Sequence, residues 1–139
     1  MNMPVPFLMR ARVYYEDTDT GGVVYYANYL RFMERARSDW LRSLGMTSVE
    51  LARTAGVLFA VHRVCVEYHS PARLDDDLTV SAEVLRLGRA GITFHQEVRR
   101  EQVLLCHGEV KIACLDVTDF RPCPLPQSIL SKLPSGSVP

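Results

Sequence analysis

The chain has 139 residues, 47% hydrophobic and 23% charged, so it is long enough to bury one hydrophobic core and too short for two ordinary domains. Its sixteen basic and sixteen acidic residues give no net charge, so the chain as a whole does not attract a polyanion. This argues against nucleic acid as a partner. The apolar run VLFAV at 57–61 is among the longest in the chain, and it is far shorter than the about 20 residues of a membrane span.

The first ten residues, MNMPVPFLMR, contain two prolines and no basic residue before their apolar part, unlike a secretory signal. We therefore expect a cytoplasmic protein. Residues 8–15, LMRARVYY, predict a first strand, although their apolar and polar side chains alternate irregularly.

The segment 28–44 is the clearest element, because its apolar side chains recur at helical spacing. At about 100° per residue, one arc holds Tyr29, Phe32, Met33, Ala36, Trp40 and Leu44. The opposite arc is polar, so the pattern predicts a helix with one buried face that ends at Gly45. Arg37 lies near the apolar edge and is expected to need an acidic or backbone partner. A second, short helix is predicted over 48–55.

From Gly56 onward the pattern changes to that of strands, which are predicted over 57–69, 78–87, 92–99 and 103–117. Three stretches predict the turns between them: PARLDDD at 71–77, GRAG at 88–91 and the polar residues 100–102. The acidic run of Asp75, Asp76 and Asp77 is expected to form a solvated turn. Because the strands follow one another as hairpins, we expect antiparallel pairing.

The segment 121–139 holds five of the eight prolines, which predicts an irregular tail with at most one helical turn around 127–132. Together these elements predict one α+β domain over 1–139, in which an antiparallel sheet of about five strands wraps around one long helix. Such a sheet leaves edges, and edge pairing between two copies is an easy route to a dimer.

The cysteines and histidines offer metal-like spacings, but none predicts a site. Cys65, Cys106, Cys114 and Cys123 lack CxxC spacing and fall mostly in apolar strand-like runs, which predicts reduced, buried thiols. On a strand, His62 and Cys65 point to opposite faces, and about 13 Å separates Cys65 from His69. These three residues cannot bind one ion without other ligands. His95 and His107 have no Ser or Cys in a nucleophile setting, which argues against a triad hydrolase.

The stretch YYEDTDTGGVVYYANY at 14–29 concentrates the groups that suit catalysis. Gly21 and Gly22 follow Asp19 closely, and adjacent glycines allow positive φ and close approach of a ligand to the main chain. The helix that follows supplies free N–H groups and a partial positive charge. Such donors can hold a carbonyl oxygen while a nearby carboxylate attacks the carbonyl or activates water. The same residue types also suit ordinary turns and caps, so both interpretations stay open.

A resemblance to a known family rests on three segments. VYYEDTDTGGVVYYANYLRFMERARSDWL at 13–41 resembles the signature segment of the YbgC-type acyl-CoA thioesterases, in the hotdog-fold 4-hydroxybenzoyl-CoA thioesterase family. VEYHSPARLDD at 66–76 and RPCPLP at 121–126 are similar to its later segments, so the likeness covers essentially the whole chain. It implies a hotdog fold and hydrolysis of an acyl-CoA thioester to a free acid and coenzyme A, with no metal or cofactor.

The resemblance also implies roles for individual residues. The second Asp of the family's DTD segment is the catalytic carboxylate, which here is Asp19, acting either as nucleophile or as general base. The backbone N–H of Tyr26 would hold the carbonyl oxygen, Tyr15 at the end of the first strand would lie near the acyl group, and Gly22 would allow close approach. YbgC-type members usually carry His where this chain has Tyr26; a backbone donor survives that change, whereas an imidazole that orients Asp19 or water does not.

Arg86 lies just before the GRAG turn and Arg89 lies within it, and both are candidates to contact the phosphates of coenzyme A, although exposed arginines need no ligand. The resemblance further implies pockets between paired subunits, so we expect at least a homodimer and more often a homotetramer. The resemblance also implies an association with the Tol-Pal envelope system and with phospholipid-synthesis enzymes. Such an association would mean peripheral contact with partners at the inner membrane.

Two other functions stay open at this point. The first is a non-catalytic acyl-CoA-binding or scaffold protein, against which Asp19 argues, because a pure binding site gains nothing from a carboxylate beside a thioester carbonyl. The second is a dehydratase on the same fold, which needs a His and an acid in the pocket, and the 14–29 stretch contains no His.

Overall fold

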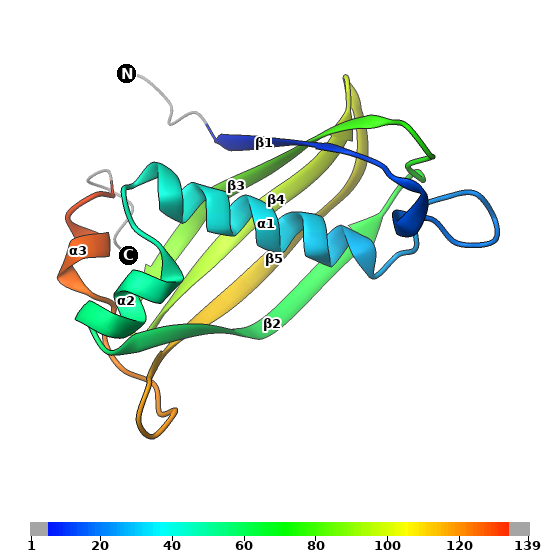
Figure 1. The fold of residues 1–139 in the computed structure, drawn as a ribbon. Helices are drawn as coiled ribbons and strands as arrows, with labels where there is room; N and C mark the ends of the chain where they lie inside the picture. Colours follow the sequence, from blue (N-terminus) through cyan, green and yellow to red (C-terminus); the bar gives the residue numbers. More distant parts are fainter. Residues whose placement is uncertain (1–5, 134–139) are drawn as a thin grey trace, which may run out of the picture.

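The computed structural model describes residues 6–133, in which a curved five-stranded sheet wraps around a long helix (Figure 1). The elements in chain order are β1 Phe7–Arg12, the 3-10 turn η1 Tyr15–Asp17, α1 Asn28–Ser43, α2 Ser48–Thr54, β2 Val57–Tyr68, β3 Asp77–Gly88, β4 Gly91–Arg100, β5 Val103–Asp116 and α3 Gln127–Leu130. This arrangement confirms the predicted α+β class and the wrapped helix. Residues 1–5 and 134–139, which include the end of the proline-rich tail, lie outside the described residues.

The sheet has the strand order β1-β3-β4-β5-β2, and every pair is antiparallel. The hairpins β3–β4 and β4–β5 confirm the turns predicted at 88–91 and 100–102. The expected hairpin between β2 and β3 is wrong, because β2 pairs with β5 at one edge while β3 pairs with β1 near the other. The segment 69–76 therefore carries the chain across the end of the sheet, a connection that turn-forming residues do not distinguish from a hairpin.

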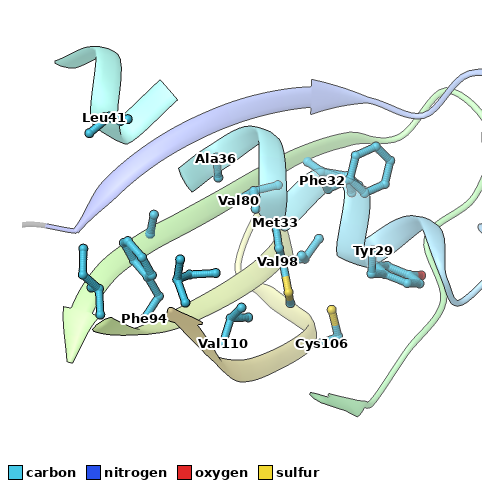
Figure 2. Close-up of a cluster of buried hydrophobic side chains, with 14 of the residues drawn as sticks. Tyr29, Phe32, Met33, Ala36, Leu41, Val80, Phe94, Val98, Cys106 and Val110 are labelled. Atoms are coloured by element: carbon cyan, nitrogen blue, oxygen red, sulfur yellow. The ribbon is translucent and has the colours of Figure 1, made fainter. Parts of the chain in front are cut away.

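The core lies between the apolar face of α1 and the inner face of the sheet (Figure 2). The buried side chains of α1 are Tyr29, Phe32, Met33, Ala36 and Leu41, and they pack near Val80, Phe94, Val98 and Val110. Each large aliphatic or aromatic side chain buried in this way contributes about 1.5–3 kcal/mol. The predicted face was thus right for its first two turns, whereas Trp40 and Leu44 are only half-buried. Trp40 instead packs edge-on against Phe94, with ring centroids 5.1 Å apart.

Gly45 ends α1 as predicted, since its φ of +86° is left-handed and favours glycine. The predicted partner for Arg37 is wrong. Its guanidinium donates to the side-chain amide oxygen of Gln96 at 2.9 Å, and Gln96, which is fully buried, donates in turn to the carbonyls of Met33 and Ser81 at 3.0 Å each. Burial lowers the pKa of Arg37. Its guanidinium is therefore held by a neutral amide rather than by an acid or the backbone.

The four cysteines are all free thiols. Cys106 and Cys114 are buried as predicted, and burial raises the pKa of each to about 12. Cys123 is half-buried with its sulfur 3.8 Å from that of Cys114, whereas Cys65 is exposed, contrary to prediction, because it lies on the outer side of an edge strand.

The predicted helical turn near the C-terminus is present as α3, anchored by the buried Ile129. None of the helices in residues 6–133 is long and apolar enough to cross a membrane.

Candidate active site

The segment between β1 and α1 forms a tight loop at one end of the sheet (Figure 1). The N–H of Asp19 donates to the carbonyl of Val23 at 2.9 Å, and the N–H of Gly22 donates to the carbonyl of Asp19 at 3.0 Å. Gly22 has a φ of +79°, which a residue with a side chain adopts only under strain, so the turn needs glycine at this position. A bridge between Val23 and Arg73 fastens the loop to the segment before β3.

The carboxylate of Asp19 is exposed and only partly engaged. One oxygen, Oδ1, accepts a hydrogen bond from the N–H of Gly21 at 2.8 Å. A Cβ at Gly21 would lie 3.1 Å from that oxygen, so the missing side chain keeps the carboxylate uncrowded. Within residues 6–133 the second oxygen has no hydrogen-bond partner. The carboxylate is therefore fixed in direction and still has an oxygen free to react.

The start of α1 is tied to the same loop through Asp17. The side-chain amide of Asn28 and the N–H of Tyr25 donate to the carbonyl of Asp17 at 2.8 and 3.0 Å. The carboxylate of Asp17 accepts from the N–H of Tyr14 at 2.9 Å. The first Asp of the DTD segment is thus a structural residue, and the second is the one left available.

The N–H of Tyr26, two residues before α1, has no acceptor within residues 6–133, as expected at the open end of a helix. The carbonyl of Tyr26 accepts a hydrogen bond from the hydroxyl of Tyr68 at 3.1 Å. That contact orients the peptide beside the free N–H. Sequence reasoning missed Tyr68, since it lies 42 residues further along the chain and only the fold brings it here.

Tyrosine rings surround this peptide. Tyr26 packs against Tyr25 with ring centroids 4.9 Å apart, and Tyr68 packs against Tyr26 and Tyr29 at 6.3 and 5.5 Å. The hydroxyl of Tyr29 accepts from the N–H of Ala72 at 2.9 Å. Burial raises the pKa of both Tyr29 and Tyr68, so these phenols stay neutral at physiological pH. They act here as hydrogen-bonding supports rather than bases.

The prediction that Tyr15 lies at the end of the first strand is wrong. The strand β1 ends at Arg12, although Val13 still donates to the carbonyl of Asp76 and accepts from the N–H of Asp75, each at 2.9 Å. The chain then leaves the sheet. Tyr15 instead begins the η1 turn, where 82% of its surface is exposed. It is in the same loop as Asp19, with its carbonyl accepting from the hydroxyl of Thr18 at 2.7 Å.

The acidic run before β3 is only partly the solvated turn that was expected. Asp75 and Asp77 are exposed, but Asp76 is half-buried and its Oδ2 accepts from the N–H of Arg73 and the guanidinium of Arg100, each at 2.8 Å. Desolvation acts to raise the pKa of Asp76, yet these hydrogen bonds and the charge of Arg100 outweigh it and hold the pKa below its ordinary value.

Arg86 and Arg89 lie at the other end of β3 from the Asp19 loop. The loop touches the segment before Asp77, and a strand of 12 residues at about 3.3 Å each spans up to about 36 Å from Asp77 to Gly88. Arg86 lies 4.0 Å from Glu109, and the carbonyl of Arg89 accepts from the N–H of Leu125 at 3.1 Å. One chain therefore brings Asp19, Gly22, Tyr15 and Tyr26 together, and it does not bring the two arginines to them.

Comparison with known families gives a match between residues 21–107 and the family model described as the Thioesterase superfamily. Among curated proteins, the acyl-CoA thioesterase YbgC of Haemophilus influenzae is 42% identical over 123 residues, which cover 88% of this chain and 90% of that protein. The acyl-CoA thioester hydrolase YbgC of Escherichia coli O157:H7 is 42% identical over 127 residues, or 91% of this chain and 94% of that protein.

Solved structures match over similar lengths. A probable thioesterase from Bartonella henselae has a TM-score of 0.84 and 34% identity, covering 88% of this chain and all of that one. The 1,4-dihydroxy-2-naphthoyl-CoA thioesterase of Synechocystis has a TM-score of 0.86 over 97% of this chain and all of its own, but at 21% identity it is evidence for the fold alone.

Proposed function

The chain belongs to the thioesterase superfamily as a hotdog-fold acyl-CoA thioesterase of the YbgC type, and we propose that it cleaves its substrate at the Asp19 loop. The observation that carries this proposal is that one loop holds both a free carboxylate oxygen and a free main-chain donor. Asp19 presents an oxygen without a partner in residues 6–133, and the N–H of Tyr26 opens from the helix start that the same loop holds in place.

In the proposed reaction the thioester carbonyl oxygen accepts a hydrogen bond from the N–H of Tyr26. Negative charge grows on that oxygen as the carbonyl carbon is attacked, and a fixed donor with the partial positive charge of a helix N-terminus stabilises it. Asp19 either attacks the carbon, giving an anhydride that water then hydrolyses, or removes a proton from the attacking water. Both routes consume one water, break the C–S bond and release a free acid and coenzyme A, with no metal or cofactor taking part.

The positions of the other predicted residues suit the two ends of the substrate. Gly22 leaves the main chain open beside Asp19, and Tyr15 offers an exposed ring in the same loop to the acyl group. Arg86 and Arg89 lie too far away to serve the same chain's loop, so we propose that they contact the coenzyme A phosphates in the site of a second subunit. On this proposal a complete site needs two copies.

The edge strand β2 gives that second copy a surface. Val61 and Val64 on β2 are 53% and 39% exposed, and the outer edge of β2 has no neighbouring strand among the described residues. We propose a homodimer as the minimum assembly and a homotetramer as the larger one. Sedimentation velocity, compared between the wild type and Val64→Lys, tests this: the mass should fall toward one chain in the variant. We also propose a cytoplasmic location, whereas peripheral contact with inner-membrane partners rests on the family resemblance alone.

The first experiment measures coenzyme A release from short aliphatic, long aliphatic and aromatic acyl-CoAs. Asp19→Asn keeps the shape of the side chain and removes its charge, and we expect turnover to fall by about 100-fold or more. Glu16→Gln is the matched control, since Glu16 is an exposed acid in the same loop. An equal loss in both variants would assign the effect to loop charge instead of Asp19. No turnover on any substrate, with acyl-CoA binding unchanged in Asp19→Asn, would favour the non-catalytic binder.

A further inference from the structure

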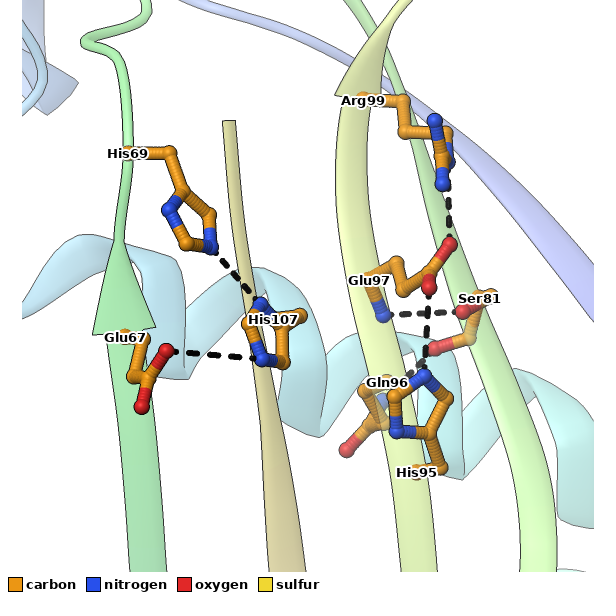
Figure 3. Close-up of polar contacts among 8 residues, drawn as sticks. All are labelled: Glu67, His69, Ser81, His95, Gln96, Glu97, Arg99 and His107. Carbon is orange, nitrogen blue, oxygen red and sulfur yellow. Dashed lines mark hydrogen bonds and ion pairs between the residues drawn. The ribbon is translucent and has the colours of Figure 1, made fainter. Parts of the chain in front are cut away.

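Two neighbouring strands at the edge of the sheet bring together three side chains that the hydrolysis does not use. Glu67 of β2 and His107 of β5 are directly paired across the strands. His69 follows the last residue of β2, and its N–H still donates to the carbonyl of Leu105 on β5 at 2.8 Å, so its ring stacks on that of His107 beside Glu67. Figure 3 shows Glu67, His69 and His107 turned toward one another, with a helix behind the strands. The group lies on the outer side of the sheet, opposite the core and α1.

The ligand atoms of this group lie within reach of one ion. Nε2 of His69 is 2.8 Å from Nδ1 of His107, and the two rings are nearly parallel, with an interplanar angle of 11°. Oε2 of Glu67 is 3.7 Å from Nε2 of His107. One nitrogen of each ring and one carboxylate oxygen all lie within 4.8 Å of one another. Ligand atoms around a tetrahedral ion with bonds of about 2.0–2.1 Å stand about 3.3 Å apart, a spacing between the two contacts observed here.

His107 meets its two neighbours through different ring nitrogens, so one of the three side chains must turn before all can bind the same ion. Glu67 is free to do so, because 72% of its side chain is exposed and no Arg or Lys in residues 6–133 pairs with it. Glu97, the acid on the other side of His107, differs. Its carboxylate is held by Arg99 at 2.9 Å and His95 at 3.2 Å, and only 29% of the side chain is exposed.

We propose that Glu67, His69 and His107 bind one divalent transition-metal ion of the zinc, cobalt or nickel class. Imidazole nitrogens favour these ions over magnesium and calcium, which prefer oxygen-only sites, and the carboxylate offsets part of the ion's charge. Water completes the coordination at this exposed position. The bound ion links the edge strand β2 to β5 on the outer side of the sheet, so its role is to hold these strands together.

The test uses full-length protein without a histidine tag, freed of metal by chelation and dialysis. Zinc binding is measured by competition with a chromophoric chelator, and cobalt binding by the visible absorption of the ion. We expect one ion per chain and a rise in the thermal unfolding midpoint when zinc is added. His69→Gln, His107→Gln and Glu67→Gln should each weaken binding by about tenfold or more.

Two matched variants separate this site from other ligands. His62→Gln removes an exposed histidine of the same strand, and Cys65→Ser removes the exposed thiol nearby; both should bind zinc as the wild type does. Circular dichroism of each variant confirms that it is folded. The proposal is overturned if zinc does not bind saturably below millimolar concentration, or if binding survives His69→Gln and His107→Gln. Loss of binding in Cys65→Ser alone would overturn it too, by assigning the ion to the thiol.

Discussion

Asp19 and Asp76 lie in turns that touch, since Val23 of one is bridged to Arg73 of the other, yet their carboxylates are in opposite situations. Asp76 is half-buried, and its Oδ2 accepts both from the N–H of Arg73 and from the guanidinium of Arg100. Asp19 is exposed and accepts from the N–H of Gly21 through one oxygen, with no cation beside it in residues 6–133.

The difference shows why acidic residues in neighbouring turns need not share a role. A carboxylate whose hydrogen bonds come from a cation and the main chain stabilises the fold, and it would lose those bonds if it reacted. A carboxylate held at one oxygen keeps its direction and has the other oxygen available. We therefore propose that Asp76 serves stability and Asp19 serves the reaction, a division that mutation of each residue can test.

The largest expected effect is the loss of turnover in Asp19→Asn with stability unchanged. We expect kcat to fall about 100-fold or more, and the free energy of unfolding to change by no more than about 0.5 kcal/mol. Rate assays and urea denaturation on the same preparations measure both quantities. A drop in stability as large as that of Asp76→Asn would contradict the division.

Asp76→Asn should show the reverse pattern. It removes the charge that pairs with Arg100 and weakens two hydrogen bonds, so we expect the free energy of unfolding to fall by about 2 kcal/mol. At a temperature where the variant is fully folded, kcat should remain within a few-fold of the wild type. A 100-fold loss of kcat in folded protein would place Asp76 in the active site (about the size expected for a general base).

The pH dependence of stability sharpens the same contrast. The folded-state pKa of Asp76 lies below its unfolded value of about 3.9. Its contribution is therefore complete above the unfolded pKa and is lost as the pH falls through the folded pKa. We expect wild-type stability to fall below about pH 4 more steeply than that of Asp76→Asn. Glu97, whose pKa is also lowered, contributes in the same direction to both proteins, and so their difference reports Asp76.

Gly22→Ala tests whether the shape of the Asp19 loop matters for the reaction. No atom lies within 4 Å of the added Cβ, so the penalty comes from the positive φ, and we expect a loss of about 1 kcal/mol. Gly45→Ala is the control, with a φ of +86° and equally open surroundings at the far end of α1. Both variants should lose similar stability, but only Gly22→Ala should lower kcat. Equal kcat in the two would mean that loop shape is unimportant.

The smallest effect is expected for Tyr26→Phe. The proposed donor is the main-chain N–H, which this substitution keeps, so kcat should change far less than the about 100-fold expected on removal of an oxyanion donor. Steady-state kinetics on the preferred acyl-CoA measure the change. A loss of that larger size would assign the phenol, and not the peptide, to the reaction.

Much of the fold could be predicted because short-range periodicity determines it. The apolar side chains of α1 recur at helical spacing, Gly45 ends the helix, and strand-like runs located β2, β3, β4 and β5. The neighbours of β2 could not be predicted in this way, since a turn sequence states that the chain changes direction and not which strand it meets next.

For the candidate site too, residues close together in the sequence could be predicted, and contacts between distant residues could not. Asp19, Gly22 and Tyr26 share one loop, so a single stretch of sequence was enough to nominate them as candidates. Contacts over long separations were missed: Tyr68 with Tyr26, and His69 with His107, 38 residues away. The position of Tyr15 was wrong because the end of β1 depends on where its partner β3 begins.

The buried contact between Arg37 and Gln96 has a consequence for a site more than two helical turns away. A smooth apolar helix could slide along the sheet by one turn, about 5.4 Å, and still bury its side chains. Such a shift would move the guanidinium of Arg37 among apolar side chains. It would also leave the amide of Gln96 and the carbonyls that it binds without hydrogen-bond partners. The hydrogen bonds of Arg37 and Gln96 are therefore satisfied at only one position of α1 along the sheet. In that position Asn28 donates to the carbonyl of Asp17, which ties the start of α1 to the Asp19 loop. A contact in the middle of the helix thus helps to place the N–H of Tyr26 relative to Asp19.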